Sequence, residues 1–395
     1  MINENILNKI LLNLLMVVPA ILLISNLAPS IWGFKIHQIV NGIIVLISII
    51  LLFIKNTALT ILLLWFYFMQ KVVNNNNISD YLDNWGGLIT ILVLLNAKNK
   101  DLINNDKIKL FFILTSIPLV IAILQIFNIL PYNAGAYYSQ ENYTRWFGDI
   151  VIRPSGYLYH PYDLVIFACF FYLFLLFRYK KTSLLLLGAA NIILIKLKAG
   201  IVLFLVLYLY IVRKKTKYYT YIYILGAIII YFVVTKIGIF EITTLFQIDK
   251  LKEFNSQLFT GRLFIWNILI DNYIDASFLI KVIGFGAEGA RNIIFSDYRW
   301  KSLFLPGAHN AILDILITNG IIGLFIYFYL FFKFIKLIHE IDTNKKISHI
   351  VIIIVVILGL TGPIFSSFYF WIATYFLAVY NPEYNAKINI EKGMR

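Results

Sequence analysis

The sequence predicts an all-α polytopic membrane protein with about twelve transmembrane helices. Of its 395 residues, 61% are hydrophobic and 17% aromatic, but only 14% are charged, whereas soluble globular proteins carry about 25% charged residues. One membrane span takes about 20 residues, so a chain of this length and composition has room for about a dozen. A soluble enzyme and a disordered scaffold are excluded. Cys169 is the sole cysteine, which also excludes a secreted disulfide-bonded domain.

Apolar segments divide the chain into three groups of helices. Residues 1–130 hold helices one to five, residues 158–236 hold helices six to nine, and residues 310–395 hold the last three and a tail. The first segment lacks a small-x-small cleavage site, so we expect it to remain as a helix. The predicted helices are 7–28, 37–54, 57–73, 82–96, 109–130, 158–178, 182–196, 199–212, 219–236, 310–332, 348–361 and 365–380.

Basic residues are concentrated in the connections on one side of this arrangement. With the amino terminus in the cytoplasm, the cytoplasmic connections carry most of the Lys and Arg residues, including Lys98, Lys107, Arg178, Arg213, Lys214, Lys336 and Lys346. Short connections on the other side, such as 29–36 and 74–81, have almost none. By the positive-inside rule both termini are cytoplasmic. The formal net charge of +14 is therefore mainly a topology signal, and no nucleic-acid partner is predicted.

Two connections on the outer side are unusually long, at residues 131–157 and 237–309. The longer one contains Leu245, Ile248, Leu251, Phe254 and Leu258 at helical spacing, and then Trp266, Leu269 and Tyr273. Neither run is long enough to cross a bilayer, so both are predicted to be amphipathic helices at the outer surface. We expect the function to reside in these two loops.

Several cations on the outer side are not explained by topology. A charge near the membrane interface is expensive unless it faces a cavity or an anion, although snorkelling of long side chains is an alternative explanation. Snorkelling fits Arg145, Lys196, Arg291 and Arg299 better. We favour an anion-binding role for Lys198 and Arg262, because Gly200 and Gly261 beside them would let a backbone approach a ligand closely.

His309 and Asn310 stand where the second long loop re-enters the membrane. A neutral imidazole there could take a proton from a hydroxyl group. A structural helix cap is the competing interpretation. His160, within the sequence Tyr157 to Pro161, is a second candidate for the same role.

Common cofactor and metal motifs are absent or lack their context. Gly284 to Gly289 has the spacing of a dinucleotide fingerprint, but no βαβ unit surrounds it, so we interpret it as a turn. The sequence has no Walker loop, no HExxH and no CxxC. It also has no Asp-x-Asp, whose carboxylates a metal-dependent glycosyltransferase would need. No cofactor and no metal ion are predicted.

The ordered motifs resemble the Wzy/O-antigen ligase superfamily of bacterial polysaccharide polymerases and ligases. These are Arg153-Pro-Ser-Gly156 with His160-Pro161, Lys198-Ala-Gly200, Gly261-Arg262 with Trp266, Gly284-x-Gly286, His309-Asn310, and Gly320-x-x-Gly323. The resemblance covers about residues 150 to 330 in motif order. It implies a GT-C-type helical fold in the bacterial cytoplasmic membrane, acting without a metal on undecaprenyl-pyrophosphate-linked oligosaccharide at the outer face.

The resemblance also implies roles for individual residues. Arg262 and the basic position at Lys198 would hold the pyrophosphate, and His309 would act as the base. Relatives usually have arginine where this chain has Lys198, which cannot form bidentate hydrogen bonds; Lys196 or Arg153 would supply the missing donors. We expect the substrate-binding set to be Arg153, His160, Lys196, Lys198, Asn310 and Trp266.

Three functions are compatible with the sequence. The Arg-Pro-Ser-Gly and His-Pro block favours a polymerase over an O-antigen ligase that transfers finished polysaccharide to lipid A core or another acceptor. A flippase or transporter is disfavoured, since no paired repeat is visible and the helices contain almost no acids. Direct displacement with inversion is expected, while Glu288, Asp297 and Asp163 leave an acidic base open. Partners implied by the resemblance are the lipid bilayer, a flippase and chain-length regulator proteins.

Overall fold

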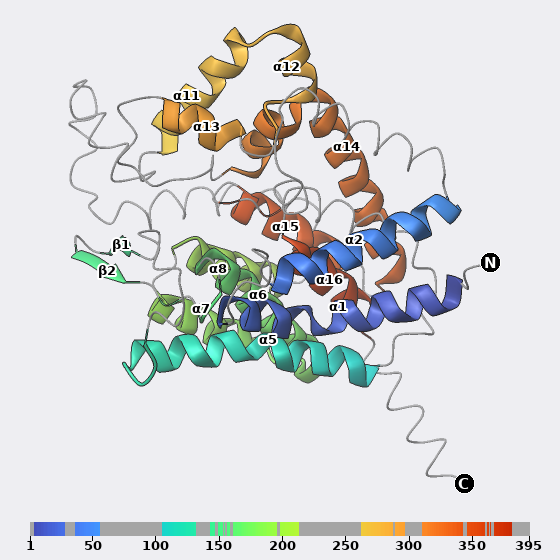
Figure 1. The fold of residues 1–395 in the computed structure, drawn as a ribbon. Coiled ribbons are helices and arrows are strands. Elements are labelled where there is room, and N and C mark those ends of the chain that lie inside the picture. Colours follow the sequence, from blue (N-terminus) through green and yellow to red (C-terminus); the bar gives the residue numbers. More distant parts are fainter. Residues whose placement is uncertain are drawn as a thin grey trace.

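The computed structural model describes residues 4–27, 36–55, 105–131, 143–146, 149–152, 154, 156–158, 161–195, 198–212, 262–286, 289–296, 310–342, 346–359, 362, 364 and 367–380. Figure 1 shows the helices packed into a bundle with a helical cap on one side. The helices are α1 (Glu4–Leu27), α2 (Ile36–Lys55), α5 (Asn105–Ile126), α6 (Pro161–Tyr179), α7 (Ser183–Ile195), α8 (Lys198–Val212), α11 (Arg262–Asp275), α12 (Phe278–Ile283), α13 (Gly289–Ser296), α14 (Ala311–Ile341), α15 (Ile347–Gly359) and α16 (Phe368–Val379).

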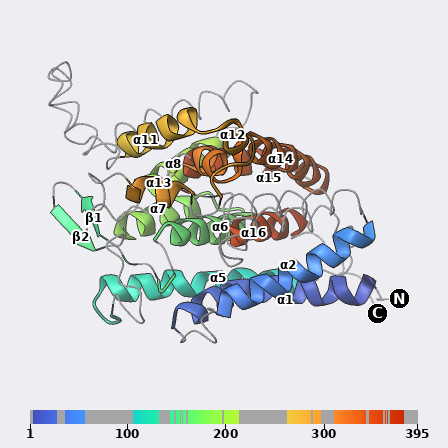
Figure 2. The ribbon, with the colours of Figure 1, turned by 45° about the horizontal axis from the view of Figure 1, so that its top comes forward.

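The helices form layers (Figures 1 and 2). The helices α1, α2 and α5 lie together on one side, α6, α7, α8, α15 and α16 form the middle, and α11 to α13 lie on the opposite side against α14. Packing follows the chain from α5 to α8, and α15 then joins α8 to α14.

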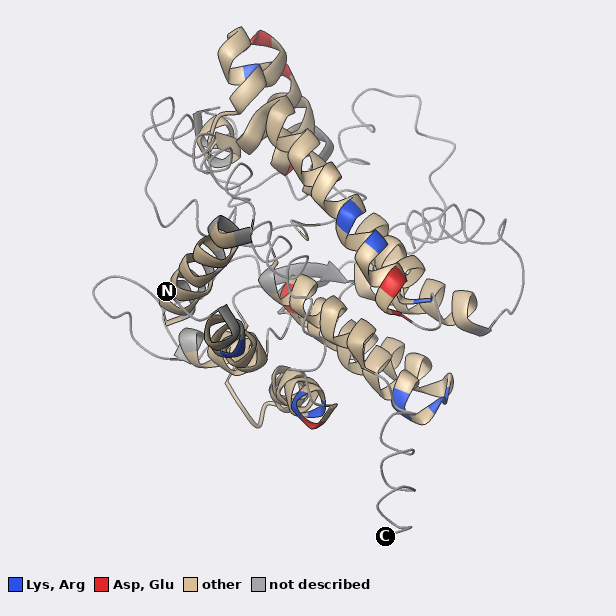
Figure 3. Cartoon of the chain, turned by 90° about the vertical axis from the view of Figure 1, so that its right-hand side faces the viewer, with Lys and Arg blue, Asp and Glu red and all other residues tan. Residues whose placement is uncertain are grey.

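The prediction of helical membrane spans is confirmed at this level. Nine predicted segments coincide with α1, α2, α5 to α8 and α14 to α16, whereas the predictions at 57–73, 82–96 and 219–236 lie outside the described residues. Three described helices are long and apolar enough to cross a membrane, at Asn105–Ile126, Tyr162–Tyr179 and Ala311–Ile341. The charges of the described helices gather toward helix ends (Figure 3). The count of twelve spans and the GT-C-type fold remain predictions.

Two local features differ from the prediction. The first long loop contains a short antiparallel hairpin, β1 (Tyr143–Trp146) and β2 (Asp149–Ile152), so the described chain is helical except for these strands. The helix α14 continues to Ile341, well past the predicted end at residue 332. Lys333 and Lys336 mark the end of the apolar run, but lysine is a good helix former and does not end the helix.

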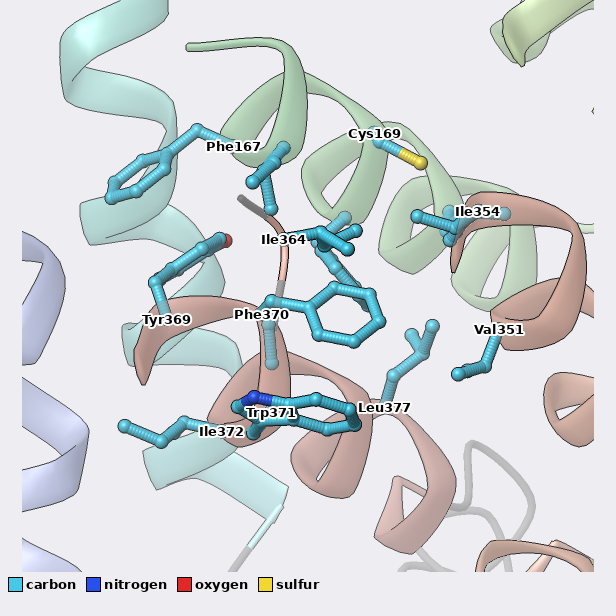
Figure 4. Close-up of a cluster of buried hydrophobic side chains, with 14 of the residues drawn as sticks. Phe167, Cys169, Val351, Ile354, Ile364, Tyr369, Phe370, Trp371, Ile372 and Leu377 are labelled. Atoms are coloured by element: carbon cyan, nitrogen blue, oxygen red, sulfur yellow. The ribbon is translucent and has the colours of Figure 1, made fainter. Parts of the chain in front are cut away.

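An aromatic core joins α5, α6 and α16 (Figure 4). The Tyr369 ring stacks on Phe167 with 3.8 Å between ring centroids and on Phe111 with 5.6 Å. The Tyr369 hydroxyl donates to Thr115 Oγ1 at 3.0 Å, and that hydroxyl in turn donates to the Phe111 carbonyl. This buried tyrosine therefore has a hydrogen-bond partner as well as aromatic packing, as a buried hydroxyl requires.

The helix α14 is broken at Gly320, where the backbone has φ 63° and ψ −169°. In an unbroken helix, the carbonyls of Ile317 and Thr318 would accept from the N–H groups four residues later. Here they accept instead from Phe285 N at 2.7 Å and Gly286 N at 3.0 Å, which belong to the turn after α12. The second long loop is thus joined to α14 by main-chain hydrogen bonds.

Candidate active site

The first turns of α6 and α14 lie against the end of α15, and the first turn of α8 lies against α6. The Tyr162 hydroxyl, at the start of α6, donates to the Leu358 carbonyl at 2.6 Å. A Cβ added to Gly359 would lie 3.6 Å from Ala311 Cβ at the start of α14. A Cβ at Gly200, at the start of α8, would lie 3.0 Å from Val165 in α6. Tyr162, two residues after His160, and Ala311, two residues after His309, thus lie beside the same short segment, Leu358 and Gly359.

This gathering has an electrostatic consequence. The starts of helices carry unpaired N–H groups and the positive end of the helix dipole. In the sequence, the single helix α7 lies between α6 and α8. In space, α15 packs against both α8 and α14. Several helix starts at one end of the bundle make that end attractive to anions such as phosphate groups.

The outer assembly consists of α11, α12, α13 and the first part of α14 up to Gly320. Its interior is a separate hydrophobic cluster of buried side chains, namely Ile265, Leu269, Ala290, Ile293, Ile294, Leu313 and Ile317. The Tyr273 hydroxyl of α11 donates to the Lys281 carbonyl of α12 at 2.5 Å. Burial raises the pKa of Tyr273 above its ordinary value, which already leaves the hydroxyl protonated at neutral pH. These contacts hold α11, which begins at Arg262, against the helix that begins after Asn310.

Two glycines allow the segment after α12 to pack closely against α14. Gly284 (φ 87°) and Gly320 (φ 63°) both adopt left-handed backbone conformations that favour glycine. A Cβ on Gly284 would lie 2.3 Å from the Thr318 carbonyl oxygen, and a Cβ on Gly320 would lie 2.4 Å from the Val282 carbonyl oxygen. Each glycine therefore faces the backbone beside the other. Gly284 to Gly286 form a non-helical link that contacts α14, Gly289 begins α13, and the two residues between them lie outside the described part of the chain.

The structure describes only some of the residues predicted to form the site. Arg262 is the first residue of α11 and Lys198 the first residue of α8, and their side chains are outside the described part, as are Arg153, His160, Lys196 and His309. Trp266 is half-buried and packs against the cluster of the outer assembly. Gly200 packs against Ile192 and Val165, so its close contacts are with neighbouring helices.

Asn310 is the N-cap residue of α14. Its side-chain oxygen accepts from the N–H groups of Ile312 and Leu313, both at 3.1 Å. Asparagine is among the preferred residues at this position because it satisfies N–H groups that have no partner within the helix. Asn310 thus fills the capping role that was the competing interpretation of His309, and His309 precedes the cap.

The sequence reasoning missed two polar residues near the site. Gln125 is fully buried; its Nε2 donates to the Pro131 carbonyl and its Oε1 accepts from Gly156 N, both at 3.1 Å. Asn319, also buried, donates through Nδ2 to Thr318 Oγ1 at 2.9 Å. An amide side chain within an apolar helix was the available signal, since such residues need internal partners in a membrane.

Three carboxylates are alternative candidates for the general base. Asp163 lies half-buried in the first turn of α6, and Glu288 and Asp297 are outside the described residues. Within the part of the chain that the structure describes, no three His, Cys, Asp or Glu side chains gather where they could hold a metal ion.

Comparison with known proteins identifies one family. Residues 183–328 match the family model described as O-antigen ligase. This segment contains α7, α8, the outer assembly and the break of α14, and it is less than half of the chain. No curated protein matches the chain. The family indicates a glycosyltransferase-like membrane enzyme of the ligase or polymerase type. Residues 183–328 thus match the O-antigen ligase family model, which supports the resemblance to the Wzy/O-antigen ligase superfamily.

Proposed function

We propose that the protein is a polysaccharide polymerase. It transfers a growing glycan from undecaprenyl pyrophosphate onto another lipid-linked repeat unit at the outer face of the bacterial cytoplasmic membrane. The family match over residues 183–328 is the observation that supports this class of reaction. The starts of α6 and α14 lie against Leu358 and Gly359, and the start of α8 lies against α6; this arrangement supports a site for an anionic leaving group at that end of the bundle.

The proposed reaction is a direct displacement. A hydroxyl oxygen of the acceptor sugar attacks the anomeric carbon, the bond from that carbon to the pyrophosphate oxygen breaks, and the hydroxyl proton passes to His309. Fixed cations at Arg262 and Lys198 offset the charge that grows on the leaving pyrophosphate. Arg153, Lys196, His160, Asn310 and Trp266 would contact the substrate. One displacement inverts the configuration at the anomeric carbon.

An O-antigen ligase is the alternative function, because it shares this chemistry and differs in its acceptor. The resemblance of Arg153 to Pro161 to the polymerase branch favours the polymerase. A lipid-linked oligosaccharide flippase is less favoured, because the candidate cations lie toward the two outer loops of the predicted topology instead of near the bilayer midplane.

Gene deletion followed by gel analysis of surface polysaccharide tests the proposal. A polymerase deletion leaves a single repeat unit on the acceptor. A ligase deletion leaves no transferred sugar, and lipid-linked polymer accumulates. The second result would contradict the polymerase assignment while keeping the reaction class.

Complementation with Arg262 variants tests the site. Arg262→Ala should abolish polymer while the protein still inserts, and Arg262→Lys should restore little because a point charge lacks bidentate geometry. Lys281→Ala, which removes a cation from the neighbouring helix α12, is the matched control and should keep activity. Polymer of near-normal length from Arg262→Ala would remove this residue from the site.

The purified enzyme should keep its activity in EDTA. A loss of activity that added magnesium restores would reveal a metal site.

A further inference from the structure

The hairpin of α11 and α12 exposes a row of large apolar side chains, which we call the apolar stripe. It consists of Ile270, Ile274, Phe278 and Leu279. Ile270 and Ile274 are one helical turn apart and so share one side of α11. Phe278, at the start of α12, is 82% exposed, the most exposed large hydrophobic side chain of the described residues. In water, exposed apolar side chains gathered on one hairpin in this way are unfavourable.

A polar row runs beside the apolar stripe. Asn267, Asp271 and Asp275 also recur every four residues along α11, and all three are exposed. Each follows a residue of the opposite character, so the two rows lie on neighbouring sides of the same helix. A third side, with Ile265 and Leu269, is buried in the outer assembly. An exposed surface split in this way matches a helix at the boundary between hydrocarbon and water.

The break of α14 fixes the depth of this hairpin. From Ile315 to Phe332 the sequence of α14 contains no charged residue, and Ala311–Ile341 is one of the described helices long and apolar enough to cross a membrane. The turn after α12 is bonded to Ile317 and Thr318, which lie near the start of this uncharged run. The end of α12 is therefore fixed to the first apolar turns of a candidate membrane span.

We propose that the apolar stripe of α11 and α12 is seated in the outer leaflet and contacts lipid acyl chains. The hairpin is then a membrane-anchored element within the second outer loop, and the polar row faces the aqueous side. The main-chain bonds to Ile317 and Thr318 hold the stripe at this depth. This proposal rests on the chain spanning a membrane and does not depend on the proposed reaction.

Single-cysteine labelling in lipid nanodiscs tests the depth. Nitroxide labels are placed at Phe278→Cys and Ile274→Cys in the stripe, and at Asp271→Cys in the polar row. Phe325→Cys, on the exposed side of α14 within the uncharged run, gives the lipid reference. The unmodified chain is the labelling blank, because its sole cysteine, Cys169, is buried.

Power-saturation EPR then compares collisions with oxygen, which concentrates in hydrocarbon, and with a water-soluble nickel chelate. We expect the oxygen-to-nickel ratio at positions 278 and 274 to match the lipid reference and to exceed that at position 271 several-fold. A ratio at position 278 equal to that at position 271 would place the hairpin in water and overturn the proposal. Low access to both reagents with an immobile spectrum would indicate a protein partner, and would overturn it equally.

Discussion

The aromatic core and the outer assembly are stabilised in different ways. In the core, Tyr369 is held by ring stacking and by a side-chain hydrogen bond to Thr115. In the outer assembly, the contact with α14 is made by main-chain hydrogen bonds and by Gly284 and Gly320, which lie against the opposing backbone. Side-chain packing can adjust to substitutions of similar volume, whereas a backbone contact at a glycine has no room for any side chain. The region proposed to hold the substrate is thus the less tolerant of substitution.

If the chemistry lies beside the outer assembly, removal of His309 should have the largest effect. His309→Ala should lower turnover by about 10²- to 10⁴-fold, the usual contribution of a general base, while binding of lipid-linked donor remains. Asn at this position cannot accept the proton, so His309→Asn should be equally inactive. Initial rates with purified enzyme provide the measurement. Normal turnover by His309→Asn would show that His309 is not the base. His160 would then be the candidate, and the reaction would not depend on the start of α14.

The backbone contact itself is tested by Gly320→Ala. The backbone conformation of Gly320 (φ 63°, ψ −169°) costs a non-glycine residue about 1–3 kcal/mol, and crowding against the Val282 carbonyl adds about 1–3 kcal/mol. We expect a lower melting temperature and faster proteolysis of the second outer loop. Gly359→Ala is the control, because its new Cβ would have neighbours no closer than 3.6 Å. Equal behaviour of the two variants would mean that the docking of the loop on α14 is not strained by a side chain.

A smaller effect is expected at the cap of α14. Asn310→Ala should destabilise the protein by about 1 kcal/mol, since two N–H groups lose their partner, and Asn310→Asp should restore the melting temperature. The Asp variant also separates capping from substrate binding. Restored stability with weakened donor binding would show that Asn310 contacts the substrate as well, whereas restored activity would limit Asn310 to the cap.

The smallest effect is expected in the aromatic core. Tyr369→Phe keeps both ring contacts and removes one hydroxyl, so it should cost no more than about 1 kcal/mol of stability. Thr115 still donates to the Phe111 carbonyl. Activity should be unchanged at temperatures below the melting transition. A loss of turnover in the folded variant would contradict the view that the core only supports the bundle.

The course of the helices was predictable because the signals are local. The apolar run that ends near Arg178 and the basic turn after it specify α6 and α7 without knowledge of their neighbours. The break in α14 is different. Gly320 lies within an uncharged apolar run, and its left-handed backbone depends on Gly284, which is far away in the sequence. Such a contact between distant backbones leaves no periodic pattern.

For the candidate site, the sequence predicted mainly which residues stand at the starts of helices. Lys198, Arg262 and Asn310 do stand at or beside the starts of α8, α11 and α14. Asn310 could have been recognised as a cap, because it precedes the apolar helix directly. The meeting of the starts of α6 and α14 at Leu358 and Gly359 could not be predicted, because Tyr162 and Ala311 reach the end of α15 through tertiary packing.

Gln125 gives the first outer loop a property of its own. One side chain of the bundle binds the carbonyl of Pro131 and the N–H of Gly156, and so holds both ends of the intervening segment at fixed positions. The entropy of closing a loop between fixed ends grows slowly, by about 0.6 kcal/mol for each doubling of length. Changes in the length of the segment between these ends should therefore cost the bundle little stability, because both ends stay bound to Gln125 of α5.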